Sequence, residues 1–126
     1  MEEPLDGALV QAAEEVAHRV GMQVRFEGAR GVVVPGETRE ALIRIVREAV
    51  TNAARHGGAQ RVALELRNGR GLRLRVADDG SGFVAGETRP GSFGLVSMRE
   101  RTEALGGRFR LETEPGAGTA IEVAIS

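Results

Sequence analysis

The chain has 126 residues, a formal net charge of -1 and no cysteine, so its length suits one domain, and disulfides and cysteine-bound metal sites are excluded. Near neutrality gives no overall attraction to nucleic acid or acidic membranes, and the absence of Trp and Tyr leaves few rings for base stacking. All 17 basic residues are arginine, which excludes a P-loop and lysine Schiff-base chemistry. The apolar runs are far shorter than a membrane span, so we expect a cytoplasmic domain, although a larger parent could be membrane-anchored.

The first 36 residues predict one helix, one strand and a connection. Apolar residues recur at helical spacing over residues 5–20, and Gly21 ends this helix. Residues 22–27 alternate between apolar and polar side chains, which is the pattern of a strand. Residues 28–36 then connect this strand to the next element, because Pro35 and Gly36 interrupt the short apolar run within them.

The stretch 39–56 predicts a long helix with a polar border. On a helical projection, six apolar residues share one stripe: Leu42, Ile45, Val46, Ala49, Val50 and Ala53. Glu48, Asn52 and Arg55 lie along its edge within an arc of roughly 60°, which suggests the wall of a ligand site. Thr38 is the expected N-cap, and His56 with the two glycines after it ends the helix.

The next stretch predicts a hairpin followed by a loop. Residues 62–66 and 72–76 each alternate apolar and polar side chains, and Asn68-Gly69 between them is a tight-turn signal. Residues 84–92 have the Gly, Pro and Thr content of a loop. The two strands therefore pair in an antiparallel manner, and a loop follows the second strand.

The last third predicts a helix and a closing hairpin. A helix from Phe93 or Gly94 to Leu105 is followed by two glycines, and residues 109–111 and 121–125 alternate across a glycine-rich turn. With three amphipathic helices covering one face of a mixed, mostly antiparallel sheet, the expected fold class is an α+β two-layer sandwich over residues 1–126.

Asp78, Gly80 and Gly82 stand where a strand reaches a loop. A carboxylate there can accept a hydrogen bond from an amine, and the glycines let the backbone approach a ligand closely. A glycine-rich turn after a strand would leave the same pattern. Residues 80–85 also match the dinucleotide fingerprint G-x-G-x-x-A, but residues 86–90 cannot continue a helix and the nearby Asp side chains would repel a pyrophosphate.

Two further glycine-containing stretches are ambiguous by themselves. Residues 91–95 precede the third helix, whose first N–H groups could hold phosphate oxygens without a lysine, although this signal alone favours a plain glycine-containing helix entry. Residues 116–119 suit an ordinary hairpin turn. No His, Asp and Glu residues have metal-ligand spacing, and no Ser/His/Asp arrangement is supported.

Taken together, in order and spacing, four motifs resemble the N, G1, G2 and terminal Gly-Thr boxes of the GHKL ATPase superfamily. They are Glu48-x-x-x-Asn52-Ala-x-Arg55-His56, Asp78-x-Gly80-x-Gly82, Gly94-Leu95 and Gly118-Thr119. Residues 94–107 are similar to sensor histidine kinases that pair with LuxR/NarL-type response regulators. The resemblance covers roughly residues 22–126 and implies the Bergerat fold, in agreement with the two-layer sandwich.

By this resemblance, the long helix carries the catalytic and metal-binding side chains. Glu48 would be the polarising base near the γ-phosphate, and Asn52 would hold Mg²⁺. Arg55 stands where this family often has lysine, and its planar guanidinium group keeps the positive charge that would contact phosphates. His56 would be a further phosphate or ribose neighbour.

The same resemblance assigns the adenine and phosphate contacts. Asp78 would accept the adenine amino group, Gly80 and Gly82 would let the loop pass the base, and Thr119 would support Asp78 or a water there. Residues 84–92 would form the ATP lid, in which Ser92 replaces the first glycine of the usual G-x-G. The triphosphate would be anchored at the helix start by two residues, Gly94 and Leu95.

The implied function is an excised catalytic domain that uses ATP and Mg²⁺ to phosphorylate a histidine on a separate dimerisation domain, upstream of a LuxR/NarL-type response regulator. His18 lies within the domain's own first helix and is not the expected acceptor. Two alternatives remain open: a nucleotide-binding regulatory module without turnover, and a serine kinase of the anti-sigma type.

Overall fold

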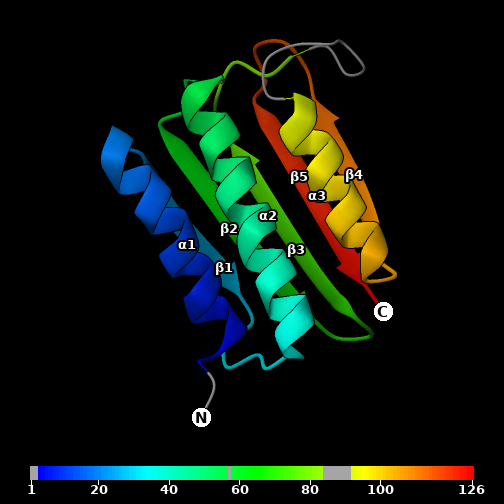
Figure 1. The fold of residues 1–126 in the computed structure, drawn as a ribbon. Helices are drawn as coiled ribbons and strands as arrows, with labels where there is room; N and C mark the ends of the chain where they lie inside the picture. The colour runs from blue at the N-terminus through cyan, green and yellow to red at the C-terminus, as the bar shows by residue number, and fades with distance from the viewer. Residues whose placement is uncertain (1–2, 57, 84–91) are drawn as a thin grey trace.

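The computed structural model describes residues 3–56, 58–83 and 92–126, and within them five strands and three helices form two layers. The elements, in chain order, are α1 (Leu5–Val20), β1 (Gln23–Gly28), α2 (Gly36–Arg55), β2 (Arg61–Asn68), β3 (Leu72–Asp78), α3 (Ser92–Ala104), β4 (Arg108–Thr113) and β5 (Thr119–Ile125). All three helices lie on the same face of one sheet (Figure 1). The predicted α+β two-layer sandwich is confirmed.

The sheet has the strand order β1-β2-β3-β5-β4, so the last strand of the chain lies inside the sheet. β1 pairs with β2 in parallel, and the other three pairings are antiparallel, which confirms a mixed, mostly antiparallel sheet. In the pairing of β3 with β5, Asp78 lies opposite Thr119. Two predicted site residues that are far apart in sequence are therefore neighbours.

The core lies between the sheet and the three helices. All six residues of the predicted apolar stripe of α2 are buried. From the sheet, Leu64, Leu66 and Leu74 pack against them, each with at most 1% of its surface exposed. Apolar and polar residues alternate along β2 and β3, so the apolar side chains of these strands face the helices and their charged side chains face outward.

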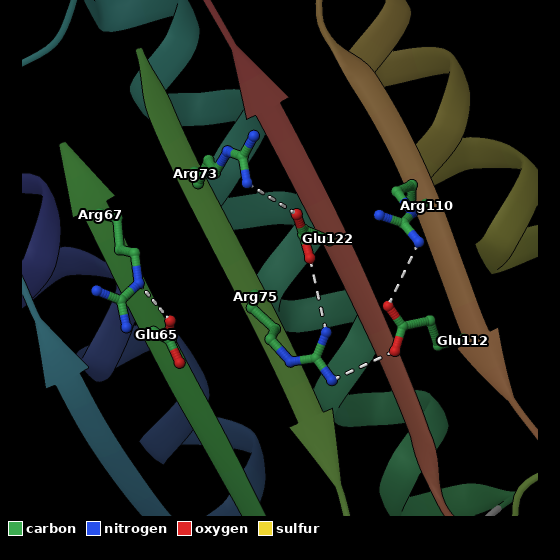
Figure 2. A network of polar contacts seen from close by, with 7 residues as sticks. All are labelled: Glu65, Arg67, Arg73, Arg75, Arg110, Glu112 and Glu122. Atoms are coloured by element: carbon green, nitrogen blue, oxygen red, sulfur yellow. Dashed lines mark hydrogen bonds and ion pairs between the residues drawn. The ribbon is translucent and has the colours of Figure 1, made fainter. Parts of the chain in front are cut away.

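The outer face of the sheet carries an ion-pair network (Figure 2). Arg75 contacts Glu112 at 3.5 Å and Glu122 at 3.6 Å. Arg73 also contacts Glu122, at 3.9 Å, and Arg110 also contacts Glu112, at 3.8 Å. Partly exposed pairs of this kind add little stability individually. They keep this face polar, which suits a sheet that is covered by helices on its other side.

The start of α2 corrects one prediction. The helix begins at Gly36, with Pro35 in the N-cap position and no side-chain cap, so the prediction of Thr38 as N-cap is wrong. The reason is that Pro35 already has its φ fixed at -56°, and its carbonyl accepts the N–H of Arg39 at 3.0 Å. Thr38 therefore lies within the first helical turn.

The connection before α2 is held against α1. The Asp6 carboxylate accepts the Val32 N–H at 3.2 Å, and the Leu5 N–H donates to the Val32 carbonyl at 2.7 Å. Val32 is buried, so one residue of the short apolar run belongs to the core without forming a strand. Within the described residues, no helix is both long enough and apolar enough to cross a membrane.

Candidate functional site

The predicted site residues gather at one end of the molecule. At this end α2 and β3 finish, α3 begins, and β4 turns into β5, as Figure 1 shows. The start of α1 and the end of β5 lie toward the opposite end (Figure 1). This arrangement follows from the topology, because successive antiparallel elements return their connections to the same two ends of the sheet.

The first cluster lies between α2 and the start of α3. Glu48 and Asn52 are half-buried and one turn apart, as helical spacing requires. A Cβ placed on Gly94 would overlap the Glu48 carboxylate and lie 3.0 Å from Asn52 Nδ2. A side chain at position 94 would therefore have to displace the Glu48 carboxylate, and the structure brings these three predicted residues together.

Among the described residues, the side chains of Arg55 and His56, also predicted for this cluster, form no hydrogen bond or ion pair with those three residues. The His56 N–H donates to the Asn52 carbonyl at 2.9 Å and its side chain is half-buried, whereas Arg55 is exposed and has no ion pair among the described residues. Leu95 packs against the hydrophobic core, so its side chain serves the fold. Ser92 is the first residue of α3.

The second cluster surrounds Asp78 at the end of β3. Its carboxylate is half-buried and accepts the N–H of Gly80 at 2.8 Å. Burial raises the pKa of Asp78 above its usual value of 3.8, the backbone N–H groups of Gly80 and Thr119 partly offset this, and the charge of Asp79 adds to the rise. A carboxylate has two oxygens with two lone pairs each, so one that is held by two backbone donors can still accept a further hydrogen bond.

Asp79 has a role that sequence reasoning missed. Its carboxylate accepts the N–H groups of Gln60 at 2.8 Å and Arg61 at 2.9 Å. These two bonds hold the pKa of Asp79 below its usual value. The connection between α2 and β2 is therefore tied to the end of β3, next to Asp78. The only signal for this role in the sequence was a second acidic residue after a strand. Its partners, 18 and 19 residues away, could not be recognised from the local sequence.

The loop after Asp78 rests on the β4–β5 turn. The Gly116 N–H donates to the Ser81 carbonyl at 2.6 Å. Gly82 has φ +64°, and a Cβ there would overlap the Glu114 carbonyl oxygen. Gly118 has φ +76°, and a Cβ there would overlap the Asp78 carbonyl oxygen. Both glycines are thus required by backbone conformation and by close approach.

Other predictions have mixed outcomes. Gly80 is buried beside Asp78, as a close-approach position would be, and His18 is exposed on α1. The residues predicted to form a lid, 84–92, lie outside the described part of the chain except for Ser92. In the ranges that the structure describes, no group of three or more His, Asp or Glu side chains could hold a metal ion.

Comparison with known proteins identifies relatives of this chain. Residues 37–126 match the sequence profile of the "Histidine kinase-, DNA gyrase B-, and HSP90-like ATPase" family. The sensor protein VraS of Staphylococcus epidermidis is 41% identical over 110 residues, which are 86% of this chain and 31% of that protein. VraS of Staphylococcus haemolyticus is 41% identical over 91 residues, or 71% of this chain and 26% of that protein. The chain therefore spans less than a third of these curated relatives.

Solved structures show the same architecture. The ATP binding domain of PrrB from Mycobacterium tuberculosis superposes with a TM-score of 0.79 at 26% identity, covering 98% of this chain and 93% of that one. The histidine kinase domain of the Erythrobacter litoralis EL346 blue-light activated histidine kinase gives a TM-score of 0.75 at 28% identity, covering 97% of this chain and 60% of that one. Both similarities extend over nearly the full length of the chain.

Proposed function

Because the chain belongs to the family of histidine kinase-, DNA gyrase B- and HSP90-like ATPases, as an ATP-binding domain of the sensor histidine kinase type, we propose that it is the catalytic domain of a two-component sensor kinase. It would transfer the γ-phosphoryl group of ATP to a histidine on a separate dimerisation domain. The observation that carries this proposal is the placement of Glu48, Asn52 and Gly94 together, at the same end of the sheet as Asp78.

The adenine end of the proposed site is built on Asp78. One carboxylate oxygen of Asp78 accepts the Gly80 N–H, and the carboxylate keeps further lone pairs that can accept the adenine amino group. Gly80 and Gly82 would let the loop pass the base, and Thr119, opposite Asp78 in the sheet, would support the carboxylate through its backbone N–H or a water through its hydroxyl. A carboxylate at this position favours an amino donor over the carbonyl oxygen that guanine carries at the corresponding position.

The phosphate end is built on α2 and the start of α3. The side chains of Glu48 and Asn52 lie in the space that a Cβ on Gly94 would fill, so their polar atoms face the first turn of α3. An amide oxygen suits Mg²⁺, so Asn52 would hold the ion, which supplies positive charge to the phosphates. The backbone at Gly94 and Leu95, after Ser92, would hold triphosphate oxygens, with Arg55 and His56 as outer neighbours.

Catalysis would rest on positioning and electrostatics. In the transfer, the bond from the γ-phosphorus to the bridging oxygen breaks, a phosphorus–nitrogen bond forms on the acceptor imidazole, and ADP leaves. Glu48 would polarise the acceptor by taking up its proton. The half-buried position of Glu48 beside Asn52 favours turnover over mere nucleotide binding.

The proposal extends to the location and partners of the parent protein. Similarity of residues 94–107 to kinases of one subfamily supports a LuxR/NarL-type response regulator as the downstream partner. A cytoplasmic position for this domain fits a requirement for ATP, and the parent could be membrane-anchored. Neither nucleic acid nor direct membrane contact by this domain is part of the proposal.

The test combines this chain with radiolabelled ATP and the separately expressed dimerisation domain of its parent. We expect acid-labile phosphate on a histidine of that domain, and none with Glu48→Gln as the matched control. Nucleotide binding without phosphorylation would favour the regulatory module, and acid-stable phosphoserine on a protein partner would favour the anti-sigma type of kinase.

A further inference from the structure

We propose that Thr113, at the end of β4, is a positioning residue that orients Thr119 and thereby contributes to the choice of adenine over guanine. This inference rests on the proposed function, since it assumes that the nucleotide base lies beside Asp78. No ligand contact is assigned to Thr113 itself. It would act through the hydroxyl group of its neighbour and through the loop that follows Asp78.

The Thr113 hydroxyl joins the two segments that flank Asp78. It accepts the Phe83 N–H at 3.1 Å, lies 3.0 Å from the Thr119 hydroxyl oxygen, and donates to the Gly118 carbonyl at 3.3 Å. Thr113 is paired with Thr119 across β4 and β5, and Thr119 is paired with Asp78 across β5 and β3. One half-buried hydroxyl thus connects the loop after Asp78 to the strand beside it.

We assign the single Thr113 proton to the Gly118 carbonyl, and this assignment gives the direction of the other bonds. A hydroxyl group has one proton and two lone pairs. If Thr113 donates to Gly118, it can only accept from Phe83 and Thr119, which uses its full capacity. The Thr119 proton then points toward Thr113, and the lone pairs of Thr119 remain available to accept hydrogen bonds on the side of Asp78.

This orientation has a consequence for base selection. An acceptor beside the Asp78 carboxylate matches the amino group of adenine or a water that donates to it. If the Thr113 hydroxyl were absent, the Thr119 hydroxyl could rotate and donate its proton, which would suit the carbonyl oxygen of guanine. The fixed acceptor therefore raises the selectivity of the site for adenine, in addition to the effect of Asp78.

Backbone contacts of the same turn make this role separable from folding. The Gly116 N–H bond to Ser81 and the close approach of Gly82 to Glu114 do not involve the Thr113 side chain. Replacing Thr113 with valine keeps the shape of the side chain and puts a methyl group in place of the hydroxyl. We therefore expect the loop to stay on the turn while the orientation of the Thr119 hydroxyl is lost.

The experiment measures the affinities of Mg-ATP and Mg-GTP by calorimetry for the unmodified domain, Thr113→Val and Thr113→Ser. Thr113→Val is expected to lower the ATP-to-GTP affinity ratio about tenfold, the order of one hydrogen bond, and Thr113→Ser to keep the original ratio. Thr38→Val is the matched control, because Thr38 lies at the other end of α2. If Thr113→Val fails to fold, Thr113→Ala provides the same comparison.

The outcomes separate the two proposals. Failure of the unmodified domain to bind ATP would overturn the proposed function itself. If that domain binds ATP and the folded Thr113 variants keep the same ATP-to-GTP ratio, then only the positioning role is overturned. A parallel loss of ATP and GTP affinity, with no change in their ratio, would assign Thr113 a purely structural role and would also overturn the inference.

Discussion

Asp79 and Arg61 exchange two hydrogen bonds: the Arg61 N–H donates to the Asp79 carboxylate at 2.9 Å, and the Asp79 N–H donates to the Arg61 carbonyl at 3.2 Å. The N–H of Gln60 adds a bond of 2.8 Å to the same carboxylate. The segment that follows α2 is thereby fixed to the residue that follows Asp78. Asp79 thus links the helix that carries the proposed phosphate end of the site to the strand that carries its proposed adenine end.

This attachment predicts a pH-dependent loss of stability in Asp79→Ala. Backbone donors lower the pKa of Asp79 in the folded state below 3.8, so its contribution is present above that pH and is lost as the pH falls through the lowered value. We expect Asp79→Ala to lower Tm at pH 7 and the difference from the unmodified domain to shrink toward pH 3. Glu14→Ala, which removes an exposed carboxylate on α1, is the control. A difference that stays constant from pH 7 to pH 3 would argue against this role.

Gly94→Ala tests the contact between α3 and α2. The new methyl group would displace the Glu48 carboxylate and press on Asn52, so we expect phosphotransfer to fall at least tenfold while the domain still folds, since the Glu48 side chain can move. Gly36→Ala, where a Cβ meets nothing within 4 Å, should change stability by less than about 0.5 kcal/mol. Normal phosphotransfer by Gly94→Ala would show that the packing at this point is not needed for catalysis.

Gly118→Ala and Gly21→Ala separate backbone strain from steric overlap. The two glycines have similar φ values, +76° and +71°, but a Cβ on Gly118 overlaps the Asp78 carbonyl oxygen whereas one on Gly21 has nothing within 4 Å. We expect Gly21→Ala to cost about 1 kcal/mol of unfolding free energy, from the left-handed conformation alone. Gly118→Ala should cost clearly more in urea titrations. Equal costs would mean that the turn relaxes freely away from β3.

Arg75→Gln should change stability little. Arg75 bridges Glu112 and Glu122 on the outer face, with 37% of its side chain exposed (Figure 2). Pairs of this exposure contribute less than about 1 kcal/mol each, and salt screens them. Unfolding in 0.1 M and in 1 M salt would measure this, and a large cost that persists at high salt would instead indicate that Arg75 supports the packing of the sheet.

Local periodicity was sufficient to predict much of the fold. The apolar stripe of α2 is buried as predicted, and α1 has the predicted bounds, because both patterns are properties of one helix alone. The hairpin of β2 and β3 also follows from its own alternation and turn. The resemblance to one ATPase superfamily supplied the placement of Glu48 and Asn52 near Gly94, which no single motif would have given.

Features that depend on pairing between distant segments were not predictable in the same way. The insertion of β5 between β3 and β4 sets Asp78 opposite Thr119, and the resemblance to the ATPase superfamily indicated this neighbour, whereas nothing local to either strand does. The hydrogen bond of Arg61 to Asp79 and that of Phe83 to Thr113 likewise join residues 18 and 30 positions apart. The expected cap at Thr38 failed because the geometry of Pro35 starts the helix earlier.

The most direct test of the account is a calorimetric titration of Asp78→Asn with Mg-ATP, beside Glu48→Gln. In Asp78→Asn the single amide oxygen stays with the Gly80 N–H, so an NH₂ group would face the adenine amino group. We expect its ATP affinity to fall roughly 10- to 100-fold, the range for a charged hydrogen bond, while Glu48→Gln binds ATP normally and loses phosphotransfer. Equal ATP affinity in Asp78→Asn and the unmodified domain would contradict the assignment of the adenine site to Asp78.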